Sequence, residues 1–214
     1  MIKIERLVFN PFQENTYIIY DETGEAVLVD PGCHEEGEEN ILETFLMERN
    51  LTPVSQIYTH CHIDHVLGAA FVYQKYGLLP IMHRDSIPFL LRRKEQGKMY
   101  GIEVDEIVEP TEFIDEGDEI KFGSSVLRVL HTPGHVDGHV CFVDDKSRFV
   151  VVGDVLFRDS IGRTDLPTGN LDILSNNIRN KIYTLGDDFT VYPGHGPSTT
   201  VGYEIMNNPF VKGW

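Results

Sequence analysis

The segment HCHIDH, at residues 60–65, places three imidazoles and one carboxylate within six positions. The residues before it, SQIYT, predict a short strand, so these side chains come where the chain leaves a sheet. Imidazole nitrogens and carboxylate oxygens are ligands that suit zinc, iron or manganese. We expect His60 and His62 to share one direction, and Asp64 and His65 to turn toward a second position. The segment therefore predicts part of a metal site.

Three later segments carry a histidine or an aspartate beside proline or glycine at an expected strand end. They are HTPGH with His135, VVVGD with Asp154 and YPGHG with His195. A single histidine is more often a core or surface residue than a ligand. Seven such residues at successive strand ends favour a metal site instead. We expect His131 and His139 to support this site rather than bind metal, and Cys61 to be a small buried apolar group.

Alternating apolar and polar residues predict strands, and apolar residues three and four positions apart predict helices. The first thirty residues predict an antiparallel meander. The chain then predicts two successive blocks of strands followed by helices, which indicate an α/β or α+β fold. The expected strands after the meander cover residues 55–60, 79–83, 118–132 as a hairpin, 139–144, 148–154 and 189–193. The expected helices cover residues 38–49, 66–77, 86–96, 171–185 and 199–207.

The composition limits the protein class and its partners. With 214 residues, of which 41% are hydrophobic, the chain has enough apolar residues for one domain over 1–214. A net charge of −16 repels polyanions, so nucleic acid is not expected as a partner. We expect no membrane span, because every apolar run is interrupted well before the roughly 20 residues required. The start MIKIERLVFN has no leader pattern, which disfavours export. The three cysteines lack the paired short spacing of a disulfide framework or a zinc knuckle, so we expect the cytoplasm.

Five segments together resemble the metallo-β-lactamase superfamily, and more narrowly its short glyoxalase II-like, or hydroxyacylglutathione hydrolase-like, branch. They are HCHIDH, HTPGH, GDVLFRDSIGRTDLPTG, VYPGHGP and NPF, in the order of that family. The resemblance implies a four-layer αβ/βα sandwich. It also implies that His60, His62 and His135 bind one metal ion, that Asp64, His65 and His195 bind another, and that Asp154 bridges the two. Zinc is the expected metal, with iron or manganese as alternatives.

The resemblance also implies a substrate. Arg163 falls where glyoxalase II-like proteins carry a basic residue that contacts a glutathione carboxylate, whereas Asp165 stands where those proteins have a tyrosine. The longer C-terminal helical region of those proteins, with its further basic contacts to glutathione, is also missing from this sequence. We therefore expect a metal-dependent hydrolase of a small acyl thioester such as S-lactoylglutathione, with Asp64 and Asp154 as catalytic residues.

Two other enzyme activities stay open, and two other functions are disfavoured. A persulfide dioxygenase would use a single iron, and a lactone hydrolase would direct the same hydroxide at a cyclic ester. A non-enzymatic protein on a retained fold is disfavoured by the presence of all seven expected ligands. A nuclease is disfavoured by the negative charge.

Overall fold

The computed structural model describes residues 1–106 and 108–213, and its chain divides into two compact units. The first unit comprises residues 1–114 and 121–126, and the second comprises residues 115–120 and the chain from residue 127 onward. The expectation of a single domain over residues 1–214 stays a prediction. Among the described residues, we find no helix long and apolar enough to cross a membrane.

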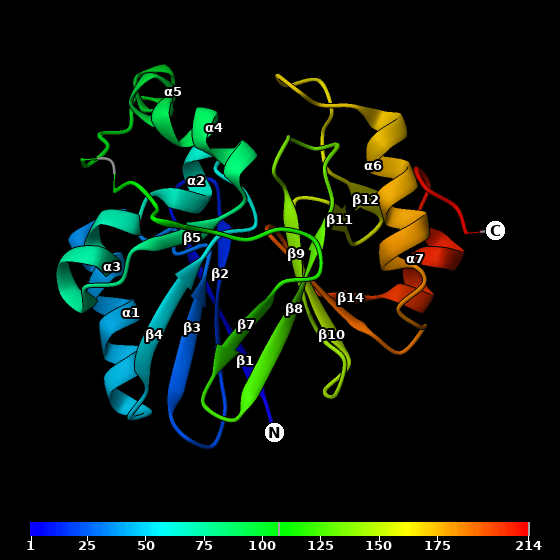
Figure 1. The fold of residues 1–214 in the computed structure, drawn as a ribbon. Coiled ribbons are helices and arrows are strands. Elements are labelled where there is room, and N and C mark those ends of the chain that lie inside the picture. Colours follow the sequence, from blue (N-terminus) through cyan, green and yellow to red (C-terminus); the bar gives the residue numbers. More distant parts are fainter. Residues whose placement is uncertain (107, 214) are drawn as a thin grey trace. The chain divides into compact units, whose positions relative to one another are not determined.

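The first unit contains a six-stranded sheet in the order β1-β2-β3-β4-β5-β6 (Figure 1). The predicted antiparallel meander is confirmed by the pairing of β1 with β2 and of β2 with β3. From β3 to β6 the strands pair in parallel, so that helices are needed to return the chain between them. The strands are β1 (Lys3–Phe9), β2 (Glu14–Tyr20), β3 (Glu25–Val29), β4 (Thr52–Ile57), β5 (Pro80–Met82) and β6 (Glu112–Phe113).

The helices of the first unit follow from apolar spacing and from glycine at a helix end. The helix α1 buries Leu42 and Leu46, four positions apart, whereas the neighbouring Ile41 is exposed. Gly77 ends α3 in the left-handed conformation, as expected for a helix C-terminus. The helical elements are α1 (Glu36–Glu48), α2 (Ile63–Val66), α3 (Ala69–Tyr76), η1 (Arg84–Ser86), α4 (Ile87–Leu91) and α5 (Arg93–Tyr100).

The second six-stranded sheet has the order β14-β13-β10-β9-β8-β7, and a two-stranded sheet pairs β11 with β12. Here β10 and β13 are parallel, whereas β9 runs antiparallel to both β8 and β10. The strands are β7 (Glu119–Phe122), β8 (Ser125–His131), β9 (Val140–Asp144), β10 (Phe149–Gly153), β11 (Leu156–Phe157), β12 (Ser160–Ile161), β13 (Thr190–Pro193) and β14 (Thr199–Thr200). Beside this sheet lie α6 (Leu171–Asn177), the π-helical turn η2 (Ile178–Ile182) and α7 (Val201–Asn207) (Figure 1).

Several expected elements differ from the observed ones. The strand expected over residues 55–60 is β4 over Thr52–Ile57, and the helix expected over residues 66–77 is α3 over Ala69–Tyr76. The single helix expected over residues 86–96 is two helices, because the chain breaks at Arg92 between α4 and α5. The helix expected over residues 171–185 is α-helical to Asn177 and then π-helical to Ile182. The strands β6, β11, β12 and β14 were not predicted, since two residues are too few to show an alternating pattern.

Asp21, directly after β2, gathers several donors of the first unit around one buried carboxylate. Its Oδ1 accepts hydrogen bonds from the Thr23 amide (2.9 Å) and hydroxyl (2.5 Å). Its Oδ2 accepts from the Ser124 amide (2.8 Å) and hydroxyl (3.0 Å) and from the Ser125 hydroxyl (2.7 Å). Burial alone would raise the pKa of Asp21, but these hydrogen bonds outweigh it and hold the pKa well below the usual range. Asp21 is therefore an ionised anchor for the turn at residues 123–125.

We expect Asp21→Ala to lower the free energy of unfolding by about 2 kcal/mol, because five partly buried hydrogen bonds lose their charged acceptor. Urea unfolding at pH 7 measures the change, and Glu109→Ala, at an exposed carboxylate, is the control. Because the folded-state pKa of Asp21 is lowered, its stabilisation is complete above the ordinary aspartate pKa of about 3.9 and declines at lower pH. Equal stability of Asp21→Ala and Glu109→Ala would contradict this role.

Candidate metal centre

Parallel pairing of β3 with β4 brings two functional loops of the first unit to the same sheet edge. Val29 and Ile57, the last residues of these strands, are register partners. The Asp30 amide donates to the Ile57 carbonyl oxygen (3.0 Å). Asp30 itself has a left-handed backbone with φ of 49°, an uncommon conformation for a residue other than glycine. This turn directs the buried Asp30 carboxylate to the start of the segment that contains HCHIDH.

Asp30 fixes the orientation of His65. Its Oδ1 accepts from the Thr59 amide (2.7 Å), and its Oδ2 accepts from the Thr59 hydroxyl (2.5 Å) and from His65 Nδ1 (3.0 Å). A carboxylate only accepts, so the His65 proton lies on Nδ1 and the lone pair lies on Nε2. A carboxylate behind a ligand histidine orients the ring and raises its basicity. His65 therefore presents Nε2 as its ligand atom.

The same threonine orients His60. Since the Thr59 hydroxyl proton is donated to Asp30, the oxygen accepts from His60 Nδ1, which lies 3.1 Å away. The lone pair of His60 is then on Nε2, 3.0 Å from His62 Nδ1. This separation is short enough for both nitrogens to bind one ion at about 2.0–2.1 Å. His60 and His62 thus form a pair with the geometry of two ligands to a common metal.

A buried carboxyl group, Glu14, lies beneath this loop. Burial is the main reason that the pKa of Glu14 is raised well above its usual value, and the nearby Asp30 adds to the effect. The Thr16 hydroxyl oxygen lies 2.9 Å from Glu14 Oε2 and 2.8 Å from the Asp30 carbonyl oxygen. One hydroxyl proton cannot satisfy both acceptors, so a protonated Glu14 completes the network. Glu14 therefore braces the Asp30 turn without adding a negative charge.

Asp64 lies in the short helix α2, and its backbone is held by an asparagine. Asn10 Nδ2 donates to the carbonyl oxygens of Gly32 (3.0 Å) and Asp64 (2.9 Å). The Asp64 side chain extends toward its neighbour, with Oδ2 lying 3.6 Å from His65 Nε2. The first unit therefore brings together all four of its expected ligands, His60, His62, Asp64 and His65. It adds Asp30, which contacts His65.

Parallel pairing also organises the second unit. Gly153 and Pro193, at the ends of β10 and β13, are register partners, and the Gly194 amide donates to the Gly153 carbonyl oxygen (2.8 Å). Asp154 and His195 follow these strand ends and therefore lie close together. Asp154 Oδ2 lies 3.7 Å from His195 Nε2 and 3.6 Å from His135 Nε2. Both distances exceed a good hydrogen bond. They suit a carboxylate oxygen that shares a metal ion with each imidazole.

Backbone contacts fix the orientation of this second group. His135 Nδ1 donates to the Arg163 carbonyl oxygen (2.8 Å), so the His135 lone pair is on Nε2 and faces Asp154. The Asp154 amide donates to Nε2 of the buried His139 (3.2 Å), whose Nδ1 lies 3.2 Å from the Thr132 hydroxyl. His139 is therefore neutral and supports the Asp154 backbone, in agreement with its expected supporting position.

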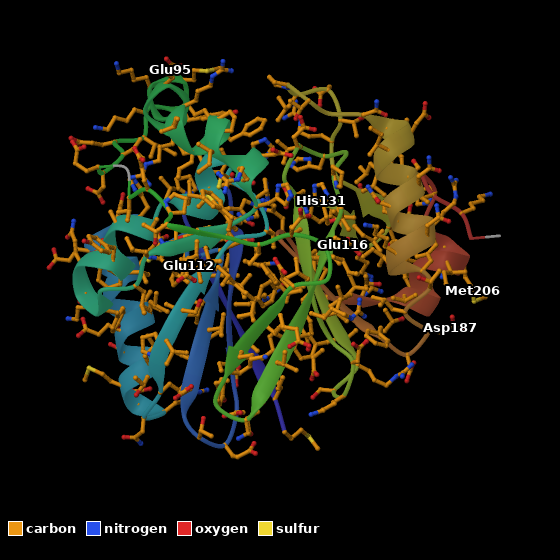
Figure 2. The ribbon with its side chains drawn as sticks, viewed as in Figure 1. Glu95, Glu112, Glu116, His131, Asp187 and Met206 are labelled. Carbon is orange, nitrogen blue, oxygen red and sulfur yellow. The ribbon has the colours of Figure 1, made fainter. Side chains whose placement is uncertain are left out.

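The described contacts of His131 and Cys61 are with residues other than the expected ligands. His131 ends β8, and its amide donates to Glu116 (2.7 Å), which also accepts from Lys181 (2.7 Å). Figure 2 shows Glu116 and His131 side by side. Cys61 is fully buried with its Sγ 3.3 Å from Met82 Sδ, which confirms that it is a small core group.

A cavity of about 450 Å³ opens beside His135, Asp154 and His195 within the second unit. Its remaining wall is apolar in part and cationic in part, and comprises Phe157, Arg158, Ser160, Ile161, Arg163, Gly196 and Pro197. The predicted substrate residue Arg163 is thus at the cavity. Arg158 was not predicted from the sequence, and its position in the same GDVLFRDSIGRTD segment is the signal that points to it.

Arg163 is paired with the residue that departs from the glyoxalase II pattern. Its Nε and one terminal nitrogen donate to the two oxygens of Asp165, at 2.8 and 2.7 Å. The pair is exposed, at 58% for Arg163 and 67% for Asp165. The hydrogen bond from Arg163 is the main reason that the pKa of Asp165 is lowered to about 2. Both groups are therefore charged at neutral pH.

Known structures with the same architecture define the class of this protein. A B3 metallo-beta-lactamase, BLEG-1, superimposes with a TM-score of 0.89 and 32% identity, covering 98% of this chain and 99% of that chain. A di-iron-bound form of TTHA1623 superimposes with a TM-score of 0.86 and 33% identity, covering 97% and 100%. The predicted α/β class with a metallo-β-lactamase fold is confirmed.

The family follows from sequence similarity across both units. The model of the metallo-beta-lactamase superfamily matches residues 9–203. Hydroxyacylglutathione hydrolase GloC of Haemophilus influenzae is 34% identical over 213 residues, covering 99% of each chain. This chain belongs to the metallo-beta-lactamase superfamily, and its class is that of a metal-dependent hydrolase.

Gly162 allows the close approach between the Arg163 loop and Asp154. A Cβ at this position would overlap the Asp154 carbonyl oxygen and would lie 3.1 Å from His135 Nδ1. We expect Gly162→Ala to lower the free energy of unfolding by about 1–3 kcal/mol and to weaken metal binding, since the loop must shift. Urea unfolding and metal titration measure these effects. Gly37→Ala is the control, because a Cβ at Gly37 meets open space, and equal behaviour of the two variants would contradict the steric argument.

Proposed function

We propose that this protein is a cytoplasmic hydrolase of small acyl thioesters, with S-lactoylglutathione or a related hydroxyacyl thioester as its substrate. The observation that carries the proposal is the position of Asp154 Oδ2, 3.6 Å from His135 Nε2 and 3.7 Å from His195 Nε2. A carboxylate between two imidazoles is suited to bridge two ions. The similarity to a hydroxyacylglutathione hydrolase supports the substrate class.

The proposed metal centre follows the ligand order implied by the family. His60, His62 and His135 would hold one divalent ion, Asp64, His65 and His195 the other, and Asp154 both. The donor set fits, because Thr59, Asp30 and the Arg163 carbonyl hold the Nδ1 protons of His60, His65 and His135. Zinc is the first choice, and iron or manganese suit the same ligands. The chemistry that such a pair supplies is a hydroxide at neutral pH and polarisation of the scissile carbonyl.

The protein's own residues orient the substrate in this proposal. Phe157, Ile161 and Pro197 give the cavity an apolar wall that suits an acyl or alkyl chain. Arg163 would donate to a carboxylate of the substrate. The thiolate leaving group is weakly basic, so its departure requires little help from a general acid. The residues thus need to position the carbonyl carbon rather than protonate the leaving group.

A substrate panel on protein of measured metal content tests the proposed function. We expect turnover of acyl thioesters with two ions bound per chain. Full activity with a single iron, together with oxygen uptake on glutathione persulfide, would indicate a persulfide dioxygenase instead. Faster turnover of lactones than of thioesters would indicate a lactone hydrolase.

We expect Asp154→Asn and Asp64→Asn each to reduce thioester turnover by about 10²-fold or more, because each removes an anionic ligand from the centre. Steady-state kinetics and metal analysis of the purified variants measure the effect. His131→Ala is the control, since His131 is not among the expected ligands and alanine keeps the contacts of its amide and carbonyl oxygen with Glu116 and Lys181. Loss of metal in His131→Ala but not in Asp154→Asn would show that the ligand assignment is wrong.

We expect Arg163→Ala to raise KM for a glutathione thioester by about threefold to tenfold and to leave the metal content unchanged, because one exposed charge-assisted contact is lost. A neutral thioester should show little change. The two substrates are compared by steady-state kinetics on the same protein preparations. Equal losses on both substrates would make Arg163 a structural residue.

A further inference from the structure

The two cations of the cavity in the second unit, Arg158 and Arg163, each have an aspartate close by. Asp165 accepts two hydrogen bonds from Arg163, at 2.8 and 2.7 Å. Asp159 Oδ2 lies 3.8 Å from Arg158 Nε, and the Arg158 guanidinium also lies over the Tyr203 ring at 5.1 Å. The positive charge at the cavity wall is therefore offset locally, in a chain whose net charge is already −16.

The loop after Arg163 holds Asp165 in this position. The Gly169 amide donates to the Leu166 carbonyl oxygen (2.9 Å), and Thr168 takes a left-handed backbone with φ of 68°. The Thr168 hydroxyl accepts from the Asp137 amide (2.9 Å), which ties the loop to the segment after His135. A Cβ at Gly169 would overlap Thr164, so the turn is tight. Asp165 is thus carried on a braced loop rather than on a free chain.

We propose that Asp165 is a specificity-determining residue that competes with an anionic substrate for Arg163. Its two oxygens occupy the edge of the guanidinium formed by Nε and one terminal nitrogen, which is the edge suited to a bidentate carboxylate. Asp165 then weakens the binding of acyl thioesters that place a carboxylate at this wall. The inference rests on the proposed function, because it concerns the thioester site.

The alternative effect of Asp165, here called preparation, would be to fix the Arg163 guanidinium in the orientation that binds the substrate. That effect requires the carboxylate of the substrate to approach the remaining edge of the guanidinium while Asp165 stays in place. The substrate would then meet a pair of zero net charge and a second carboxylate on the same group. Two carboxylates that contact the same guanidinium repel each other, even in a partly exposed site. Competition and preparation predict opposite effects of removing the Asp165 charge, so the two are separable.

The test is Asp165→Asn, which keeps the size of the side chain and removes its charge. Binding of S-hexylglutathione, an unreactive anionic probe, is measured by calorimetry on the metal-loaded protein. We expect binding to become about threefold to fivefold tighter, in proportion to the modest strength of an exposed ion pair. The gain should decrease at 1 M salt, where charges are screened beyond about 3 Å. KM for a glutathione thioester should fall by a similar factor, and KM for a neutral thioester should stay constant.

Asp145→Asn is the matched control. Asp145 accepts two hydrogen bonds from Arg128, at 3.2 and 3.0 Å, and is exposed like Asp165. It follows β9, whereas Asp154 follows β10, its antiparallel partner, so the two lie at opposite ends of this strand pair. Both variants remove one negative charge from the chain. An equal gain in binding in both variants would mean that total charge is responsible, and would overturn the proposal.

A double variant completes the test. In an Arg163→Ala background, Asp165→Asn should leave the affinity for S-hexylglutathione unchanged, because the group under competition is gone. Unchanged or weaker binding in the single variant Asp165→Asn, or absence of binding in both this variant and the wild type, would overturn the proposal. Lack of thioester turnover by the metal-loaded wild type would instead overturn the proposed function, whatever the binding of the probe.

Discussion

Parallel pairing of adjacent strands is the constraint on which both ligand groups depend. In a parallel pair the carboxyl ends lie at the same sheet edge, so residues that follow the two strands meet without a long loop. In the first unit, β3 and β4 bring Asp30 to the segment that holds His60 and His65. In the second unit, β10 and β13 bring Asp154 to His195. Each unit thus assembles its own ligand group through the same topological device.

The polar groups of these loops are buried, so each needs a hydrogen-bond partner, and the partner determines where its proton lies. Asp30, His60 and His65 are buried almost completely, where an unsatisfied donor or acceptor is costly. The neutral carboxyl of Glu14 supports the turn without adding a second negative charge beside Asp30. The hydrogen bonds to Asp30, Thr59 and the Arg163 carbonyl consequently decide which nitrogen of each imidazole is available. The orientation of the ligands is therefore set by hydrogen bonds within the folded loops.

Much of this arrangement is readable from the sequence, because local patterns produce it. The strand ends marked by glycine or proline predicted Asp154 and His195, and the antiparallel meander was predicted from alternation alone. The break at Arg92 and the two-residue strands were missed, since packing rather than local pattern determines them. The hydrogen bond from the Asp154 amide to His139 joins residues fifteen positions apart, and periodicity does not encode such contacts. Arg163 and Asp165 were both identified in the sequence, but their ion pair was not predicted, because it depends on the course of the loop.

Residues 162–165 form one turn with two functions. Its backbone contacts the ligand group, and its side chains lie at the cavity. The backbone belongs to the ligand group, because Gly162 lies against Asp154 and the Arg163 carbonyl oxygen accepts the His135 proton. The side chains of Arg163 and Asp165 instead form part of the cavity surroundings. A carbonyl hydrogen bond is indifferent to the side chain on the same residue, so substitution at positions 163 and 165 leaves the orientation of His135 intact. Substrate preference can therefore change on this loop while the ligand geometry stays constant, which is one physical route by which a single fold supports different substrates.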